Sequence, residues 1–234
     1  MDPKTFNKIA KLLSEVPPPQ GIFRRHEIPI ADFLLGFKED LIKEFLEYHT
    51  DFLDGDFVKG TPTSSIVDVD KVKTSHESWK VTRIKYDFNE DGVHHNYIIK
   101  EEVAKHFPTA MRLTEEFGDD CPISSYSILE ANSVIRRHTG VENRTGEFIR
   151  IHIPLIVPPG EIFFEVNGEE IDWSDIFAFD NQQVHSAYNR TPHRRLVYLI
   201  DLRRSRIGMP PGVPYNPFKE YTAKPFIRDG VQLT

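Results

Sequence analysis

Two patterns of hydrophobic residues divide the chain. Within residues 32–49, Phe37, Leu41 and Phe45 recur at intervals of four, a spacing that predicts an amphipathic helix buried along one face. Pro108 is a favoured first residue for another helix, which Gly118 would end. The other elements expected before residue 120 are, in chain order, a loop at 51–74, a strand at 79–88 and a short helix at 101–107.

From about residue 123 onward, short runs alternate between apolar and polar residues and are separated by turn residues. Asn167-Gly168 lies between two apolar runs and is a strong signal for a β-hairpin. The expected strands are 125–129, 133–138, 147–157, 162–167, 170–173, 176–179, 185–188 and 195–202. So many short antiparallel strands in so few residues predict a jelly roll or a small barrel, hence a mainly β fold with some α-helix.

The chain has 234 residues and a mass of 27.1 kDa, which predicts one structural domain. We expect a helical and loop-rich N-terminal wrapper at residues 1–120, a β core at 121–207 and a proline-rich C-terminal wrap at 208–234. The oligomeric state is not readable from the sequence.

Charge and composition exclude several classes of protein. The formal net charge of −7 argues against a broad nucleic-acid-binding surface. The apolar runs are too short to span a membrane, and the N-terminus lacks the apolar segment of a secretory signal. A single cysteine, Cys121, excludes an intramolecular disulfide and a CxxC metal site. The expected location is therefore the cytoplasm, with no nucleic-acid or membrane partner.

Five polar residues carry the candidate chemistry. Alternation along one strand places Arg150 and His152 together on the face opposite four aliphatic residues, and Arg195 begins another strand. Taken alone, such polar faces are typical of the solvated side of an antiparallel sheet. His138 and His185 stand at strand ends, however, and a closed double sheet can bring them together. Imidazole suits divalent iron, and a guanidinium fork matches a carboxylate, so the set favours a site for a metal and a dicarboxylate.

These motifs and their order resemble the aspartyl/asparaginyl β-hydroxylase family between about residues 126 and 201. The matching motifs are His138-Thr-Gly, Arg150-Ile-His152, Trp173, Phe179-Asp180, His185, Arg195-Leu and Asp201. The resemblance implies a double-stranded β-helix, cupin-like core and an Fe(II)- and 2-oxoglutarate-dependent dioxygenase. Such an enzyme uses O2 and 2-oxoglutarate, releases succinate and CO2, and hydroxylates a C–H bond. The implied substrate is an amino acid, an amino-acid-like molecule or a peptidyl residue, with the β-carbon as the expected target.

The resemblance also assigns roles to single residues. His138 and His185 take the place of the iron ligands, and with Arg195 they form the expected catalytic set. The residues implied for 2-oxoglutarate are Ser127, Arg150, His152, Arg195 and Trp79, with Arg195 and Ser127 on its distal carboxylate. Trp173 is expected to pack under a turn. Asp180 and Asn181 occupy a paired-acid position in which the second acid is here an amide, which leaves the surroundings of His185 open.

Gly140 leaves the usual third ligand position of a non-heme iron site without a side chain, because a carboxylate is expected two residues after the first histidine. Water fills this position in a hydroxylase, and chloride fills it in an iron halogenase, so halogenation is one alternative. A non-catalytic metal-binding β-barrel module is the other. Substrate contacts are expected from residues 51–80, residues 136–146 and the C-terminal wrap. The remaining histidines, including His26, His49, His76, His94, His95, His106 and His193, are interpreted as surface or loop residues.

Overall fold

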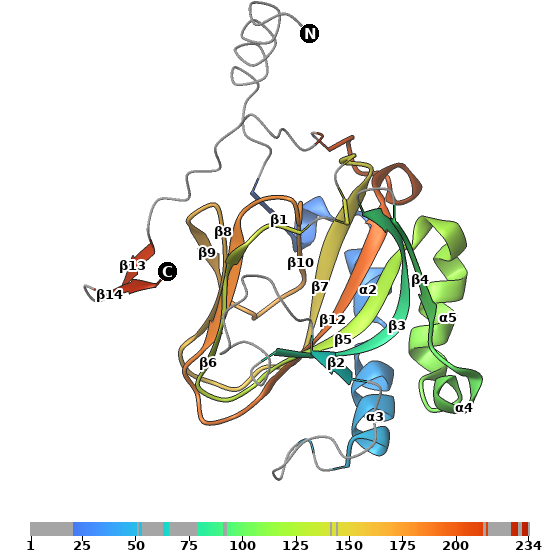
Figure 1. The fold of residues 1–234 in the computed structure, drawn as a ribbon, viewed down its shortest axis with the longest axis horizontal. Helices are drawn as coiled ribbons and strands as arrows, with labels where there is room; N and C mark the ends of the chain where they lie inside the picture. Colours follow the sequence, from blue (N-terminus) through green and yellow to red (C-terminus); the bar gives the residue numbers. More distant parts are fainter. Residues whose placement is uncertain are drawn as a thin grey trace, which may run out of the picture.

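Two antiparallel sheets face each other in the computed structural model (Figure 1). The structure describes residues 21–50, 52, 63–65, 79–90, 93–140, 142–143, 145–212, 214, 226–228 and 231–233. The large sheet has eight strands in the order β1-β10-β7-β12-β5-β3-β2, with β4 beside β3. The small sheet has the order β6-β11-β8-β9. This pair of facing sheets is the predicted double-stranded β-helix.

All eight strands expected after residue 123 are present, and the structure adds strands that the pattern did not predict. The predicted strands are β5 (Ile123–Leu129), β6 (Ser133–His138), β7 (Phe148–Ile156), β8 (Ile162–Val166), β9 (Glu169–Ile171), β10 (Phe177–Phe179), β11 (His185–Asn189) and β12 (Arg195–Arg203), and the predicted strand at 79–88 is β3 (Trp79–Glu90). The additional ones are β1 (Ile22–Arg24), β2 (Thr63–Ser65), β4 (Val93–Ile98) and the separate pair β13 (Phe226–Arg228) and β14 (Val231–Leu233). Because β1, β3 and β4 extend the large sheet, residues from the expected wrapper share a layer with the core.

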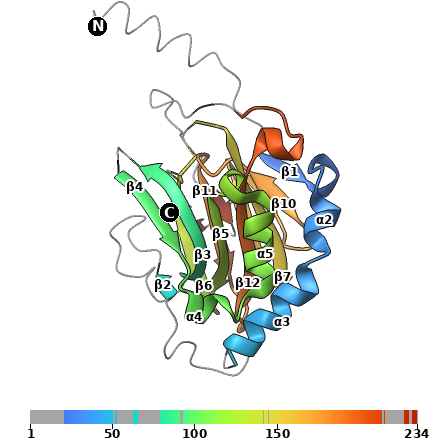
Figure 2. The same ribbon diagram turned by 90° about the vertical axis from the view of Figure 1, so that its right-hand side faces the viewer.

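Short helices cover the outer face of the large sheet (Figure 2). They are α2 (Ala31–Leu35), α3 (Lys38–Tyr48), α4 (Glu101–Ala104) and α5 (Pro108–Phe117), with 3-10 turns η1 (Arg25–Glu27), η2 (Gly118–Asp120) and η3 (Arg204–Ile207). The single helix predicted at 32–49 is wrong, because the chain breaks into α2 and α3 at Gly36 and Phe37. Glycine has a low helix propensity, which places the break at this residue. Most of the expected loop at 51–74 and of the C-terminal wrap lies outside the described residues.

The large sheet is buried on both faces. The aliphatic face of β7, with Ile149, Ile151 and Ile153, belongs to a core shared with α2, α3 and α5. The second core lies between the two sheets and includes Val197 and Leu199 of β12 together with residues of the small sheet. The polar face of β7 turns toward this second core, so the interpretation of a solvated face does not apply.

A hairpin turn and a helix end show how single residues fix the geometry of the backbone. Asn167 and Gly168 connect β8 to β9 with φ angles of 52° and 86°, the left-handed pair that a two-residue hairpin turn requires. The predicted hairpin is therefore confirmed. Glu44 of α3 caps α5 across the helix pair, because its carboxylate accepts hydrogen bonds from the backbone N–H groups of Thr109 at 2.7 Å and Ala110 at 2.9 Å.

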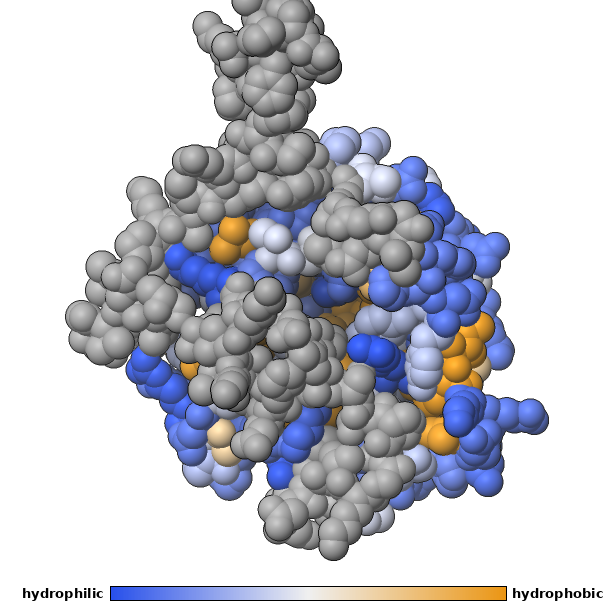
Figure 3. Space-filling model, viewed as in Figure 1, coloured by the Kyte–Doolittle hydropathy of each residue, from blue (hydrophilic) through white to orange (hydrophobic). Residues whose placement is uncertain are grey.

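Few large hydrophobic side chains are exposed on the described part of the surface. Figure 3 shows a largely hydrophilic surface on the described residues of this face. Among the described residues, the exposed large hydrophobic side chains are Phe33, Ile98 and Val134. No helix in the described part of the chain is long and apolar enough to cross a membrane.

Replacing Glu44 with alanine should destabilise the protein. The buried carboxylate also accepts a hydrogen bond from the Tyr126 hydroxyl at 2.6 Å, so the change leaves several buried donors without an acceptor. We expect Glu44→Ala to lower the free energy of unfolding by about 2–4 kcal/mol in a urea titration. Glu47→Ala, which removes an exposed carboxylate of the same helix, should change it by less than about 0.5 kcal/mol. Equal effects of the two changes would contradict the capping role.

Candidate functional site

His138 and His185 face each other between the two sheets. His138 is the last residue of β6 and His185 is the first residue of β11, and the two are direct partners in the antiparallel register. Their ring centroids lie 4.1 Å apart. His185 Nδ1 lies 2.7 Å from the carbonyl oxygen of Gln183, a contact that fixes the ring orientation when Nδ1 carries the proton. The structure thus brings together the two histidines that the sequence predicted as ligands.

A β-bulge makes this pairing possible. Ile135 of β6 points into the core between the sheets, so strict alternation would turn His138 to the opposite face. The register shifts between His185 and Ala187, where β6 has one extra residue. Arg137 instead lies on the outer face, where its guanidinium donates to the Glu165 carboxylate at 3.0 Å. The extra residue re-aims His138 toward the interior, as bulges near functional sites do.

Arg195 is a buried cation that pairs with no carboxylate of the described residues. Its side chain is 1% exposed, and its Nε lacks a hydrogen-bond partner within the described chain. One terminal nitrogen donates to Ser127 Oγ at 3.3 Å. Burial lowers the pKa of the guanidinium to about 9, so the group still carries its charge at neutral pH. A buried charge without an opposite charge is costly, and an anion that binds beside Arg195 would remove that cost.

Trp79 and Ser127 extend the Arg195 environment toward the histidines. Trp79 Nε1 donates to Ser127 Oγ at 2.9 Å, so the same oxygen accepts hydrogen bonds from the indole and from Arg195. The Trp79 ring lies 5.9 Å from the His138 ring. Four of the predicted site residues therefore form one continuous group: Trp79 of β3, Ser127 of β5, His138 of β6 and Arg195 of β12.

Trp173 has a larger role than packing under a turn. The Arg195 guanidinium carbon lies 4.4 Å from the centre of the Trp173 ring, a cation–π contact, and the His152 ring stacks on the indole with an interplanar angle of 7°. Phe164 and Phe177 also contact His152. The pKa of His152 lies well below its usual range, so its imidazole stays neutral. Burial of the ring is the largest cause, and the positive charges of Arg195 and Arg150 lower the pKa further.

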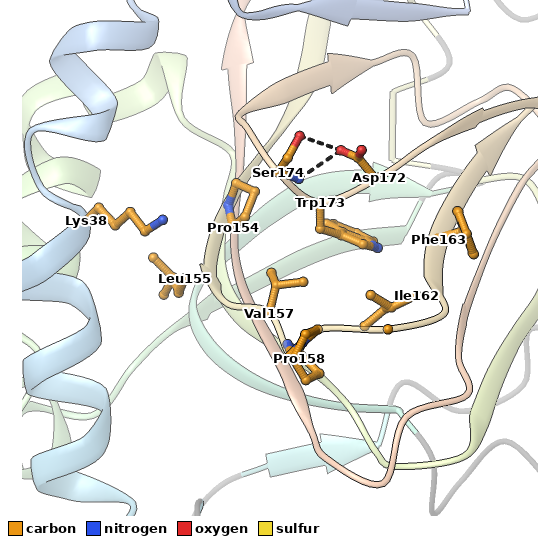
Figure 4. A pocket seen from close by; sticks show the side chains of 12 residues that line it. Lys38, Pro154, Leu155, Val157, Pro158, Ile162, Phe163, Asp172, Trp173 and Ser174 are labelled. Carbon is orange, nitrogen blue, oxygen red and sulfur yellow. Dashed lines mark hydrogen bonds between the residues drawn. The ribbon is translucent and has the colours of Figure 1, made fainter.

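A pocket of about 590 Å³ borders Trp173 (Figure 4). Val157 and Ile162 line it together with the indole, and Lys38 of α3 reaches its edge. Trp173 therefore lines this pocket and also contacts Arg195 of the barrel interior.

Arg150 differs from Arg195 because acidic residues compensate its charge. Its Nε and one terminal nitrogen donate to the two carboxylate oxygens of Asp201 at 2.8 and 2.9 Å, a bidentate pair. Glu142 lies 3.5 Å away on the other side. Burial lowers the pKa of Arg150, but Asp201 and Glu142 outweigh it and leave the pKa above its usual value. The predicted role of Arg150 at the cosubstrate stays a prediction, with Asp201 as its structural partner.

Glu142 fills the space next to Gly140. A Cβ atom at Gly140 would meet Glu142 Oε2 at 2.6 Å and Asn181 Nδ2 at 2.7 Å. Asn181 Nδ2 donates to Glu142 Oε2 at 2.9 Å, and the Gly140 N–H donates to the Asn181 carbonyl at 2.6 Å. Burial raises the pKa of Glu142, but the Arg150 charge outweighs it, so the pKa lies below its usual value and the carboxylate stays ionised. Asn181 thus positions a carboxylate at the place where the paired acid of the sequence pattern is missing.

Asp180, the other member of that pair, holds the loop before β11. Its carboxylate accepts a hydrogen bond from Arg204 at 2.5 Å, and both side chains are buried. Arg204 also donates to the Pro210 carbonyl at 3.2 Å. Asp180 therefore anchors the segment that leads to His185, and it does not face the histidines.

Sequence reasoning missed Glu142 as a site residue and did not predict the burial of His49. Glu142 follows Gly140 by two residues, which is the only signal it offered. His49 is buried at the end of α3, where its ring lies within 3.3 Å of the Thr82 hydroxyl. His76 lies outside the described residues, whereas the other histidines of that group are exposed. In the described part of the chain, no three His, Cys, Asp or Glu side chains are placed to hold a metal together.

The neutral His152 should make stability depend on pH. Its folded-state pKa lies well below 6.5, so below that pH the unfolded chain binds a proton that the folded protein does not, and stability falls as pH falls. We expect wild type to lose about 1.4 kcal/mol more than His152→Phe between about pH 7.5 and about pH 5.5 in urea unfolding. The exposed His193, changed to Phe, should leave the wild-type profile unaltered. Parallel profiles for wild type and His152→Phe would refute a neutral buried imidazole.

Comparisons with known proteins place the chain in a family. The family model for aspartyl/asparaginyl beta-hydroxylase matches residues 55–205. A search of curated proteins found no match. Among solved structures, a 2OG-Fe(II) oxygenase family oxidoreductase from Burkholderia pseudomallei is 11% identical with a TM-score of 0.39, covering 67% of this chain and 77% of its own. A Trichoplax adhaerens prolyl hydroxylase in complex with a hypoxia inducible factor peptide is 10% identical with a TM-score of 0.38, covering 88% and 95%. These structural similarities are weak and add nothing to the family match. The family match spans most of the chain and includes both histidines. The chain therefore belongs to the aspartyl/asparaginyl β-hydroxylase family and is a hydroxylase-type dioxygenase.

Proposed function

We propose that this protein hydroxylates a C–H bond of an amino acid, an amino-acid-like molecule or a peptidyl residue, with the β-carbon as the expected target. The reaction uses Fe(II), O2 and 2-oxoglutarate and releases succinate and CO2. The observation that carries the proposal is the pair of facing histidines, with rings 4.1 Å apart, next to a buried arginine that no described carboxylate neutralises. A metal on the histidines and a dicarboxylate on Arg195 fit this arrangement.

Each residue of the chain has a distinct task in this proposal. His138 and His185 hold the iron, and Arg195 binds the distal carboxylate of 2-oxoglutarate while Ser127 adds a hydroxyl. Trp79 fixes Ser127 through its indole N–H, and Trp173 holds the guanidinium against its ring. His152 presents a neutral imidazole within an aromatic shell that excludes water. When bound, iron and 2-oxoglutarate supply the oxidising chemistry, and the protein supplies orientation and a dry site.

Glu142 favours hydroxylation over halogenation. A halide in the third ligand position would lie close to the Glu142 carboxylate, because that carboxylate occupies the space beside Gly140. Two anions at such a distance in a buried site repel each other strongly. A bound water, in contrast, can donate a hydrogen bond to the carboxylate. The non-catalytic module finds no support, since the family is one of hydroxylases. The cytoplasmic location stays a prediction from the sequence.

Changing Arg195 to methionine tests the cosubstrate assignment. Loss of the guanidinium that pairs with the distal carboxylate should weaken 2-oxoglutarate binding by at least about 30-fold, while Fe(II) binding persists. The measurement is an anaerobic titration of the Fe(II) protein with 2-oxoglutarate, followed by its visible absorption band. Arg194→Met is the matched control, because Arg194 faces outward and donates to Glu130 at 2.6 Å. If Arg194→Met weakens binding and Arg195→Met does not, the assignment is wrong. His185→Ala should abolish Fe(II) binding.

Chloride titration separates the two reactions. In the same anaerobic complex, chloride should leave the visible band of the wild-type protein unchanged, because Glu142 excludes an anion from the position beside Gly140. Glu142→Gly removes the carboxylate, and we expect a chloride-dependent shift of the band in this variant only. Glu147→Gly, in which an exposed carboxylate nearby is removed, serves as the control. A chloride-dependent shift in the wild-type protein would support the halogenase alternative.

A further inference from the structure

Four consecutive polar residues are buried in the turn between β10 and β11. They are Asp180, Asn181, Gln182 and Gln183, each at most 1% exposed. The Gln183 N–H donates to the Asp180 carbonyl at 2.9 Å, which closes the turn. Turns of this composition normally lie in water, and buried polar groups are normally paired within the protein. Burial therefore commits this turn to specific partners in the folded protein.

The turn contacts both strands that carry the histidines. The Gln183 carbonyl lies 2.7 Å from His185 Nδ1, and a carbonyl can only accept, so this contact is a hydrogen bond when the ring proton is on Nδ1. The other ring nitrogen, Nε2, is then the one that can ligate a metal. The Asn181 carbonyl accepts a hydrogen bond at 2.6 Å from the N–H of Gly140, two residues after His138. A shift of the turn would therefore disturb the surroundings of both histidines together.

Arg204, the first residue of η3, pairs with the carboxylate of this turn. Its guanidinium donates to Asp180 Oδ1 at 2.5 Å, and the two side chains are 3% and 1% exposed. The guanidinium carbon also lies 5.3 Å from the centre of the ring of Phe23, which belongs to β1 beside β10. Removing one partner of a buried ion pair leaves the other charge uncompensated. The Arg204–Asp180 pair therefore resists displacement of the turn.

Arg204 also joins the segment after η3 to the loop before β7. Its second terminal nitrogen donates to the Pro210 carbonyl at 3.2 Å, and its backbone N–H donates to the Glu147 carbonyl at 2.9 Å. The Gly212 N–H donates to the Gly146 carbonyl at 3.1 Å. A Cβ atom at Gly212 would meet that carbonyl oxygen at 2.5 Å, so only glycine allows the two backbones to pass this closely. One buried arginine therefore connects the turn, the loop and the segment after η3.

We propose that Arg204 is a positioning residue for the metal site. Through its ion pair with Asp180 it fixes the turn, and the turn in turn sets the orientation of the His185 ring. The inference rests on the proposed function, because it takes His138 and His185 to be metal ligands. It gives the segment after η3 an influence on the site that acts through Arg204.

Cobalt binding tests the positioning role, because the visible absorption of Co(II) reports both affinity and ligand geometry. In a titration of the full chain with Co(II) alone, Arg204→Met should weaken binding by at least about tenfold and alter the spectrum at saturation. Arg204→Lys keeps the charge but lacks the guanidinium fork, so its loss should be smaller. Because Arg204 acts through Asp180, adding Asp180→Asn to Arg204→Met should weaken binding by no more than about a further twofold.

Two controls separate positioning from a general loss of stability. Glu44→Ala removes a buried carboxylate on the helix side of the large sheet, so it should destabilise the protein but keep the Co(II) affinity and spectrum of the wild type. Arg203→Met removes the neighbouring arginine, which donates to Asp120 at 2.7 Å, and should also leave both unchanged. The proposal is overturned if Arg204→Met binds Co(II) like the wild type, or if Glu44→Ala weakens binding as much as Arg204→Met does.

The tautomer of His185 provides a measurement without metal. In heteronuclear NMR of the imidazole nitrogens, the wild-type ring should carry its proton on Nδ1, and Arg204→Met should show a mixture of both tautomers. If the wild type binds no Co(II), the proposed function has failed and this measurement alone decides: a mixture supports the positioning role, and an unchanged tautomer overturns it. If Arg204→Met does not fold, Asp180→Asn replaces it in both measurements, and wild-type affinity together with a wild-type tautomer in that variant overturns the proposal.

Discussion

Burying the Arg195 guanidinium between two sheets without an opposite charge costs free energy, and much of the surrounding structure reduces this cost. The Trp173 ring offers its negative face, and Ser127 offers a hydroxyl oxygen that accepts hydrogen bonds from both Arg195 and Trp79. These contacts hold the cation in place but do not neutralise it. A dicarboxylate that enters the barrel would supply the missing charge, so the site is preorganised for an anion at the expense of the stability of the free protein.

The sheet can hold such a site only because both of its faces are buried. Strands β7 and β12 present hydrophobic residues to the helices, and toward the barrel interior they present the polar site residues together with Val197 and Leu199. The helices α3 and α5 cover the aliphatic face, and Glu44 joins them by capping α5. The polar face is then free to carry Arg150, His152 and Arg195 without exposing the core to water. The helix-facing side of these strands therefore contributes to one core only, whereas the interior side carries the site residues within the second core.

Two bulges decide which side chains reach the interior. In β6, the extra residue turns His138 inward beside His185. In β3, the register shifts between Arg83 and Lys85, with the result that Arg83 and Tyr86 both face the barrel while Ile84 faces the helices. Strict alternation would have separated Arg83 from Tyr86. The chemistry of the site thus depends on local departures from the regular strand.

Alternation and turn residues along the sequence were sufficient to predict the eight strands after residue 123, the hairpin at Asn167-Gly168 and the shared face of Arg150 and His152, because these follow from local geometry. The order of the motifs predicted the family. Tertiary structure alone decided the rest. Which polar face is buried depends on the opposing sheet, the bulges depend on pairing between strands, and the compensation of Arg150 by Asp201 depends on a neighbour 51 residues away. Trp173 and Glu142 gain their contacts only from residues distant in the chain, because a charge has a partner or lacks one only once the strands are paired.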